Sequence, residues 1–378
     1  MQVLEGSSQA IEPERAVAEA VAGWPVAGVD LVLVFTSPVR SASEVAAAIA
    51  ARYPDAQVVG CTTAGEHLSG MHSTGGLVMA GLTSPRMAWA TALVDELATV
   101  DAAGIRATVD GLFARLAIDR AGLDARRYFC LLFIDGLSGA EERVAPIIAD
   151  ALDGIALIGG SAGDDLAFAR TEVIHGDRAR SGAAVLALCR SDVAFHVLQH
   201  QHFSTTSRLL AITKVEGRRV HEIDGEPAAV AYARALGIAR VELTPRVAFD
   251  NPLAFRYHGV HYVRAIREIH ADDSISFYCA IEEGMVVDIG AHTDLVPALG
   301  IDLAHLAGDE PIDLLIGSNC ILRALETKRR DQHGAVGALF QRFSRHMIGF
   351  DTYGEQLAGL HMNQTLVALA LCDRAEVT

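Results

Sequence analysis

The sequence predicts an α/β protein. Its N-terminal half is expected to contain duplicated β-α-β-β units that form mixed sheets. An antiparallel α+β C-terminal domain, closed by a third related unit, is predicted to follow. The main observation is a phrase that recurs at residues 58–66, 157–165 and 348–355. Each copy joins an apolar strand end to a small-residue turn with glycine and an acidic residue. Apolar strands lie before and after every copy, and such self-similarity, here with a period of about a hundred residues between the first two copies, indicates repeated architecture.

The first unit contains the expected elements in order. Residues 10–22 are typical of a helix, and Leu31–Phe35 is an apolar strand. Ser41 and Glu44 form a capping box before a helix at 45–52. The recurring phrase and an apolar strand at 76–82 complete the unit.

The second unit repeats this order. An amphipathic helical stretch at 101–127 leads to a strand at 129–134. Ser138 and Glu141 are predicted to cap the next helix as Ser41 and Glu44 do. The second copy of the phrase and a strand at 182–188 follow.

The pattern changes after about residue 205. Short apolar runs alternate with turn residues, which indicates an antiparallel sheet. The expected strands are 209–215, 219–223, 261–266, 274–281 and 285–289, with a short helix at 227–236. The third unit starts near Ile312. We therefore expect an N-terminal domain at 25–205 and a C-terminal domain at 206–373.

Composition narrows the class of partner and the compartment. The 378 residues are 51% hydrophobic and carry a formal net charge of −16, which disfavours nucleic acid and anionic membranes as partners. The apolar runs are shorter than the roughly 20 residues of a membrane span. The six cysteines form no C-x-x-C pair, and the first residues lack a signal-peptide pattern, so we expect a cytoplasmic protein with reduced thiols.

The sequence offers no catalytic motif. Gly159–Gly163 is glycine-rich after a strand, as a phosphate-binding loop would be, but Asp164 and Asp165 follow it and would repel phosphate. Neither a G-x-S-x-G elbow nor an H-E-x-x-H motif occurs. We therefore expect that the protein is not an enzyme.

Histidines provide the first candidate site. His196, His200 and His202 share one face if their segment is extended, and three imidazoles could ligate zinc or iron. The alternative is a solvated histidine face. His258 and His261 flank a predicted hairpin turn, and His361 precedes Asn363 and Gln364. The other histidines, including His67, His72 and His333, show no constellation.

Acidic residues at the repeated turns provide the second candidate site. Glu66, Asp164 and Glu355 lie at equivalent positions near the turn tips, so similar folding would bring them together. They could line a pocket between units, or they could simply cap their turns.

These motifs resemble those of the FIST family, the F-box and intracellular signal transduction proteins. The first two copies of the phrase look like the N-terminal FIST signature. Residues 222–228, 349–355 and 361–365 look like the C-terminal FIST domain. The resemblance spans about residues 25 to 372 and implies a sensory ligand-binding module.

Within the family, the chain is similar to the nitric-oxide-sensing, haem-binding branch often called NosP. The supporting segments are 262–266, 277–284 and 319–326. This resemblance implies a non-covalent b-type haem with a histidine ligand, nitric oxide as the gaseous ligand, and a histidine kinase or cyclic-di-GMP enzyme as partner. The oligomeric state stays open, with a homodimer as one alternative.

Our own ranking of the axial ligand places His202 first, then His200, His261 and His361. His202 is nearest the domain junction and is followed by an aromatic residue, and pockets favour such junctions. The alternative function is a FIST sensor of a small polar metabolite, such as an amino acid, without haem. The expected ligand-binding residues are Glu66, Asp164, Arg264, Glu355 and Asn363.

Overall fold

The protein consists of two compact units in the computed structural model, which describes residues 1–257 and 259–373. His258 and residues 374–378 lie outside the described residues. The larger unit contains residues 1–200, 300–361 and the segment from 366 onward. The smaller unit contains residues 201–299 and 362–365. The third predicted β-unit therefore packs with the first two, although it follows the antiparallel domain in the sequence.

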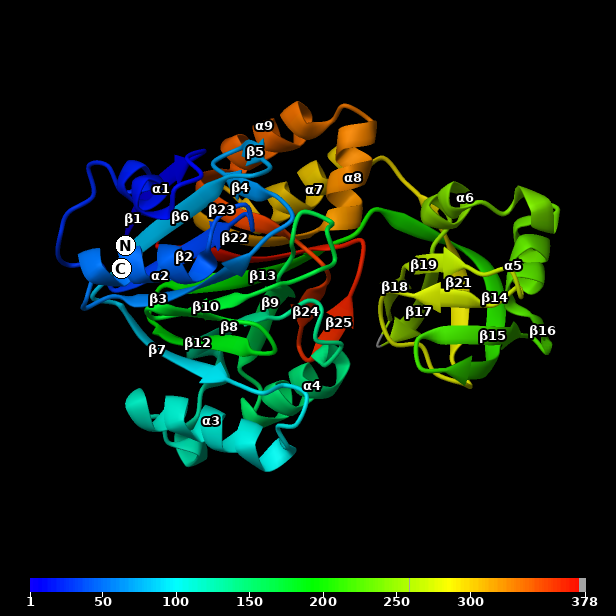
Figure 1. Ribbon diagram of the computed structural model, residues 1–378, viewed down its shortest axis with the longest axis horizontal. Coiled ribbons are helices and arrows are strands. Elements are labelled where there is room, and N and C mark those ends of the chain that lie inside the picture. Colours follow the sequence, from blue (N-terminus) through cyan, green and yellow to red (C-terminus); the bar gives the residue numbers. More distant parts are fainter. Residues whose placement is uncertain (258, 374–378) are drawn as a thin grey trace. The chain divides into compact units, whose positions relative to one another are not determined.

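Three six-stranded sheets of one plan build the larger unit (Figure 1). In order across the first sheet, the strands are β1 (Gln2–Ser8), β6 (Leu77–Thr83), β2 (Leu31–Thr36), β3 (Gln57–Thr62), β10 (Val173–His175) and β11 (Arg178–Arg180). The second sheet contains β7 (Met87–Val94), β12 (Ala184–Ser191), β8 (Tyr128–Ile134), β9 (Ala156–Ser161), β24 (Glu355–Leu357) and β25 (Leu360–Met362). The third contains β13 (Ala194–His200), β26 (Leu366–Cys372), β22 (Ile312–Cys320), β23 (Ser344–Thr352), β4 (Glu66–Leu68) and β5 (Met71–Ser73). The two central strands of each sheet are parallel, which confirms the predicted mixed sheets.

The larger unit contains the three repeated β-units, and these exchange their hairpins in a ring. Hairpin β4–β5 of the first unit pairs with β23 of the third unit. Hairpin β24–β25 of the third pairs with β9 of the second, and β10–β11 of the second pairs with β3 of the first. Every sheet of the larger unit is thus completed by a hairpin from another β-unit.

The repeated phrases meet where the hairpins cross. Phe35, Phe133 and Phe350 contribute one ring from each unit, with centroids 4.5–5.9 Å apart. Backbone hydrogen bonds connect the three turns in a closed circuit: Gly163 to Thr62, Ala64 to Asp351, and Ser161 to Gly354. The turn tips therefore converge, as the sequence predicts.

Each sheet has its own helices. They are α1 (Pro13–Ala20) and α2 (Ala42–Arg52) on the first sheet, α3 (Ala102–Arg115) and α4 (Glu141–Ala151) on the second, and α8 (Ile321–Arg329) and α9 (His333–Phe343) beside the third (Figure 1). The predicted cap at Ser41 is confirmed, because its side chain accepts from the Glu44 amide. The predicted cap at Ser138 is wrong. The N-cap of α4 is Ala140, and the Ser138 hydroxyl donates to the Asp135 carbonyl instead.

The smaller unit is the predicted antiparallel α+β domain. Its strands are β14 (Phe203–Glu216), β15 (Arg219–Ile223), β16 (Glu226–Pro227), β17 (Leu253–Tyr257), β18 (Val260–Arg264), β19 (Ile266–Ile269), β20 (Ile275–Phe277) and β21 (Val286–His292). Helices α5 (Ala228–Leu236) and α6 (Pro245–Asp250) add to its core, in which Tyr232 is the largest fully buried side chain. Helix α7 (Leu295–Ala307) follows β21 and leads back into the larger unit.

Among the described residues, none of the helices combines the length and the apolar character that crossing a membrane requires.

Candidate functional site

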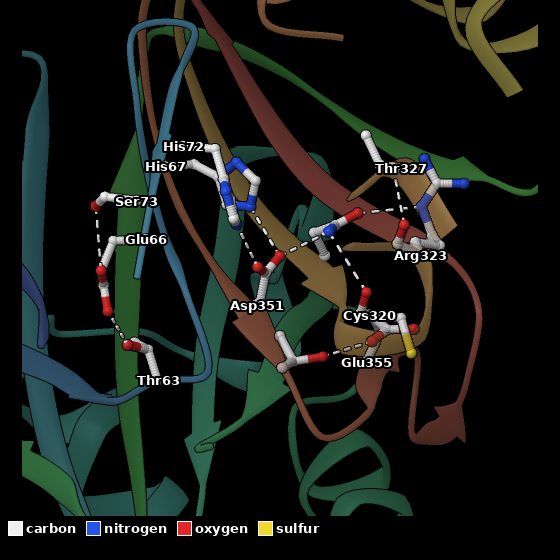
Figure 2. Close-up of polar contacts among 12 residues, drawn as sticks. Thr63, Glu66, His67, His72, Ser73, Cys320, Arg323, Thr327, Asp351 and Glu355 are labelled. Atoms are coloured by element: carbon white, nitrogen blue, oxygen red, sulfur yellow. Dashed lines mark hydrogen bonds and ion pairs between the residues drawn. The ribbon is translucent and has the colours of Figure 1, made fainter. Parts of the chain in front are cut away.

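Two histidines of one hairpin share a buried carboxylate in the larger unit. His67 on β4 and His72 on β5 are cross-strand partners. The Nε2 atom of His67 lies 2.8 Å from Oδ1 of Asp351, and Nε2 of His72 lies 2.8 Å from Oδ2 (Figure 2). Asp351 is near the end of β23 and has no exposed surface. The expectation that His67 and His72 belong to no constellation is therefore wrong.

A second layer of polar groups holds Asp351. The Asn319 amide donates to its Oδ1 at 2.7 Å, and the Arg323 guanidinium donates to Asn319 Oδ1 at 3.1 Å. Burial would raise the pKa of Asp351, but the charge and hydrogen bonds of His67 and His72 outweigh it and hold the pKa well below its usual range. Burial lowers the pKa of Arg323 to about 10. The site therefore keeps an anionic carboxylate under a fixed set of donors.

Glycine makes the close approach of hairpin and strand possible. Gly65 has φ +152°, and a Cβ there would collide with the Asp351 carboxylate. Its carbonyl accepts from the Asp351 amide at 2.8 Å, while the Ala64 amide donates to the Asp351 carbonyl. Gly70, with φ +85°, forms the hairpin turn between His67 and His72. Backbone geometry thus sets the histidines over the aspartate.

A pocket of about 360 Å³, counting space open to solvent, adjoins this cluster. Both polar and apolar side chains line it. The polar lining residues are His67, Asn319, Arg323, Thr327 and His333, and the apolar ones are Ala324, Val336, Phe340, Met347 and Leu366. The His333 ring stacks on His72 with 4.4 Å between centroids, and its pKa is lowered by burial and by the neighbouring His72.

The three predicted acidic residues accept hydrogen bonds within their own β-units, and Asp164 also accepts one from Tyr353 of the third β-unit. Glu66 is buried and accepts hydrogen bonds from the Thr63 hydroxyl, the Ser73 hydroxyl and the Gly76 amide (Figure 2). Burial raises its pKa to about 7. Glu355 accepts from the Thr352 hydroxyl in the same way.

Asp164 accepts from the backbone amides of Phe168, Ala169 and Arg170 at 2.6–2.9 Å, and from the Tyr353 hydroxyl. This geometry favours the turn-capping interpretation of Glu66, Asp164 and Glu355. Their binding roles stay predictions.

The predicted histidine face is divided between the two units. His200 ends β13 in the larger unit and its Nδ1 lies 2.7 Å from Oδ2 of Asp302. His202 belongs to the smaller unit, where its Nε2 lies 3.2 Å from Nδ1 of His292. Both rings are buried, whereas His196 is exposed.

The reserve candidates lie in different places. His361 is buried on β25, with its Nδ1 2.9 Å from the Gln356 amide. His261 is partly exposed on β18. None of the four candidate histidines is among the described residues that line the pocket.

Arg264 and Asn363 meet in the smaller unit through one thiol. The Arg264 guanidinium lies 3.5 Å from Cys279 Sγ and stacks over the Phe255 ring. The Cys279 thiol donates to Asn363 Oδ1 at 2.7 Å. Two predicted ligand-binding residues are therefore close to a common partner, and their role stays a prediction.

One sequence signal could have indicated part of the His67, His72 and Asp351 cluster. Two histidines flanking Ser69-Gly70 are cross-strand neighbours if the segment is a tight hairpin. Nothing local connects them to Asp351, which is almost three hundred residues away along the chain. Only the exchange of hairpins between units brings the three together.

Comparison with protein families gives two matches. The FIST N domain model matches residues 30–226, and the FIST C domain model matches residues 228–358. Among curated proteins, the chain matched none.

Proposed function

Because the chain belongs to the FIST family, whose domains are generally sensory ligand-binding domains of signalling proteins, we propose that it senses a small polar metabolite. The pocket of the larger unit is the proposed binding site. The observation that carries the proposal is a lining that combines polar and apolar side chains beside the buried Asp351 cluster. Ligand sites commonly combine an apolar lining with a few fixed polar groups.

The wall favours a molecule with a charged or polar head and a short apolar chain. The imidazoles of His67 and His333 and the amide of Asn319 offer hydrogen bonds. Val336 and Phe340 offer apolar contact. An amino acid or a short carboxylic acid combines the same two kinds of group.

A thermal-shift screen of amino acids and short carboxylic acids tests this function. A ligand that binds only the folded state raises the melting temperature. Ala324 lines the pocket, so Ala324→Leu should fill it and remove the shift. Ala338→Leu, on an exposed position of α9, is the matched control and should keep the shift. A shift that is unchanged in Ala324→Leu, or the absence of any shift across the panel, would contradict the proposal.

Haem-based sensing of nitric oxide is a second candidate, supported by the resemblance of residues 262–266, 277–284 and 319–326 to the haem-binding branch. As placed in the structure, three of the four candidate histidines do not fit a haem, whereas His261 is partly exposed and is not covered by the same argument. His200, His202 and His361 are each at most 3% exposed, and each ring contacts a polar neighbour. A haem-ligating ring needs an apolar slot beside it for the macrocycle. A Soret band in the purified protein that moves on addition of nitric oxide would favour this candidate, and a colourless protein that does not take up haemin would exclude it.

A sensor of either ligand would need to pass its signal to a partner protein. We propose that it has no catalysis of its own and acts on a histidine kinase or a cyclic-di-GMP enzyme. The expected result is that the protein changes the activity of such a partner, and that the pocket ligand changes this effect. Ligand can shift a partner's activity only by binding two states of the sensor differently.

A further inference from the structure

We propose that His67, His72 and Asp351 form a binding site for one divalent transition-metal cation of the Zn²⁺ or Fe²⁺ class. This site goes beyond the proposed metabolite sensing and does not depend on it. The three side chains come from the exchanged hairpin β4–β5 and from the end of strand β23, all within the larger unit.

The ligand set has the right chemistry. Two imidazole nitrogens and a carboxylate are typical ligands of zinc and of non-haem iron, and leave positions open for water or another ligand. The ligating atoms of His67, His72 and Asp351 all lie within 4.8 Å of one another. Donors at 2.0–2.1 Å around a tetrahedral cation are roughly 3.3 Å apart, so small side-chain movements suffice to admit an ion.

Binding would replace protons rather than break the fold. In the structure, each histidine Nε2 faces a different oxygen of Asp351, at 2.8 Å. A cation between these atoms would take the place of the Nε2 protons. A charged imidazole releases its Nε2 proton to solvent and keeps the proton on Nδ1, whereas a neutral imidazole moves its single proton to Nδ1 with no net release. The carboxylate contributes one negative charge, and the cation's remaining positive charge is met by water or a ligand in the pocket.

The outer layer supports an ion site. Asn319 donates to Asp351 Oδ1, and Arg323 in turn donates to Asn319. Such outer hydrogen bonds orient the ligands of metal sites and raise metal affinity. His67 and Asn319 also line the pocket, which gives the ion a path from solvent. A pocket ligand carrying a carboxylate would then reach the cation, a consequence that rests on the proposed function.

An internal comparison argues against a purely architectural role for the cluster. The equivalent junction, where β24–β25 meets β9, contains Gln356, His361 and Ser161. There Ser161 stands at the register position of Asp351, and the Gln356 amide donates to its hydroxyl at 2.8 Å. Since the same fold closes one junction with serine at this position, it does not require a carboxylate at the other. Burying an anion costs free energy that its partners must offset, so serine would be the simpler choice if this position served the fold alone.

Cobalt titration of the full chain tests the site. Co²⁺ substitutes for Zn²⁺ and gives visible absorption when bound by nitrogen and oxygen ligands in a low-coordinate site. Protein freed of metals by chelator dialysis should bind one equivalent of Co²⁺, and Zn²⁺ should displace it. His72→Ala and Asp351→Asn should each lose the absorption, while Asn319→Ala should weaken binding about 10-fold or more.

His361→Ala is the matched control, because His361 is the histidine at the equivalent junction, and it should bind Co²⁺ like the wild type. Asp351→Asn keeps the size of the side chain, and circular dichroism checks that each variant is folded. No absorption in the folded wild-type protein would overturn the proposal. Unchanged binding in either Asp351→Asn or His72→Ala would also overturn it. Metabolite binding measured in chelator remains a separate readout, so failure of the metal site and failure of the proposed function are distinguishable.

Discussion

Two of the contacts between a hairpin and a strand of another β-unit, here called junctions, contain an equivalent histidine. They differ in the side chain that this histidine contacts. Gly65 and Gly354 have nearly the same φ, +152° and +154°, and counting onward from each glycine places His72 opposite His361. The hydrogen bond from Thr63 to Glu66 is repeated from Thr352 to Glu355. At one junction the histidine faces a carboxylate, and at the other it lies beside an amide that bonds a hydroxyl.

The comparison separates architecture from function. The glycine, the threonine and the buried glutamate are present at both junctions, which indicates that they build the turn. The partners of the histidine vary while the backbone does not. Function resides in such local sets of side chains rather than in the fold that carries them, and this points to His67, His72 and Asp351.

Alanine at the two turn glycines should have the largest effect on stability. A Cβ at Gly354 would collide with the His361 ring, and one at Gly65 would collide with the Asp351 carboxylate. The positive φ adds strain at both positions. We expect Gly354→Ala and Gly65→Ala each to lower the free energy of unfolding by about 3 kcal/mol or more, measured by urea denaturation. A loss at only one position would show that the turns are not equivalent.

Zinc should stabilise one junction and not the other. At a free Zn²⁺ concentration a hundred times the dissociation constant, binding adds about 2.7 kcal/mol to the free energy of unfolding. We expect a higher melting temperature with Zn²⁺ for the wild type and for His361→Ala, and none for His72→Ala. Equal stabilisation of all three proteins would place the ion elsewhere.

Removal of the threonine hydroxyls should affect the junctions equally. Thr63→Val and Thr352→Val each take a donor from a fully buried glutamate. We expect each to cost about 1–3 kcal/mol in chemical denaturation, with the two values similar. If Thr63→Val alone were costly, Glu66 would have a role that Glu355 lacks.

The third hairpin, β10–β11, should show a small pH effect. Its His175 is partly buried, with Nε2 3.1 Å from the Thr91 hydroxyl, and burial lowers its pKa from the ordinary value. The folded state therefore binds this proton less readily than the unfolded state. His175 then favours folding fully above the unfolded pKa of about 6.5, and this stability is lost as the pH falls below it.

We expect the wild type to lose more stability than His175→Gln between pH 8 and pH 5.5, by less than about 1 kcal/mol because solvent screens the ring. Urea denaturation at both pH values measures this difference, in which other titrating groups cancel. A larger loss in His175→Gln would reverse the sign of the proposed effect.

The repeated phrases predicted much of this fold because they carry local signals. Apolar strands, turn glycines and the Ser41 cap are all determined within a few residues, and each was confirmed. The exchange of hairpins was not predictable, since strand pairing across a ring of units leaves no periodicity in the sequence. The prediction that Ser138 caps a helix was wrong because its hydroxyl donates to a carbonyl of the preceding turn. The Asp351 cluster was not predicted because it depends on this exchange of hairpins.

Anomalous X-ray scattering from zinc-soaked crystals shows directly whether a metal ion binds at Asp351. Data collected on both sides of the zinc absorption edge locate the ion without reference to activity. We predict one peak between the Nε2 atoms of His67 and His72 and the Asp351 carboxylate, and none beside His361 and Gln356. A peak beside His361, or an empty Asp351 junction in zinc-saturated protein, would contradict it.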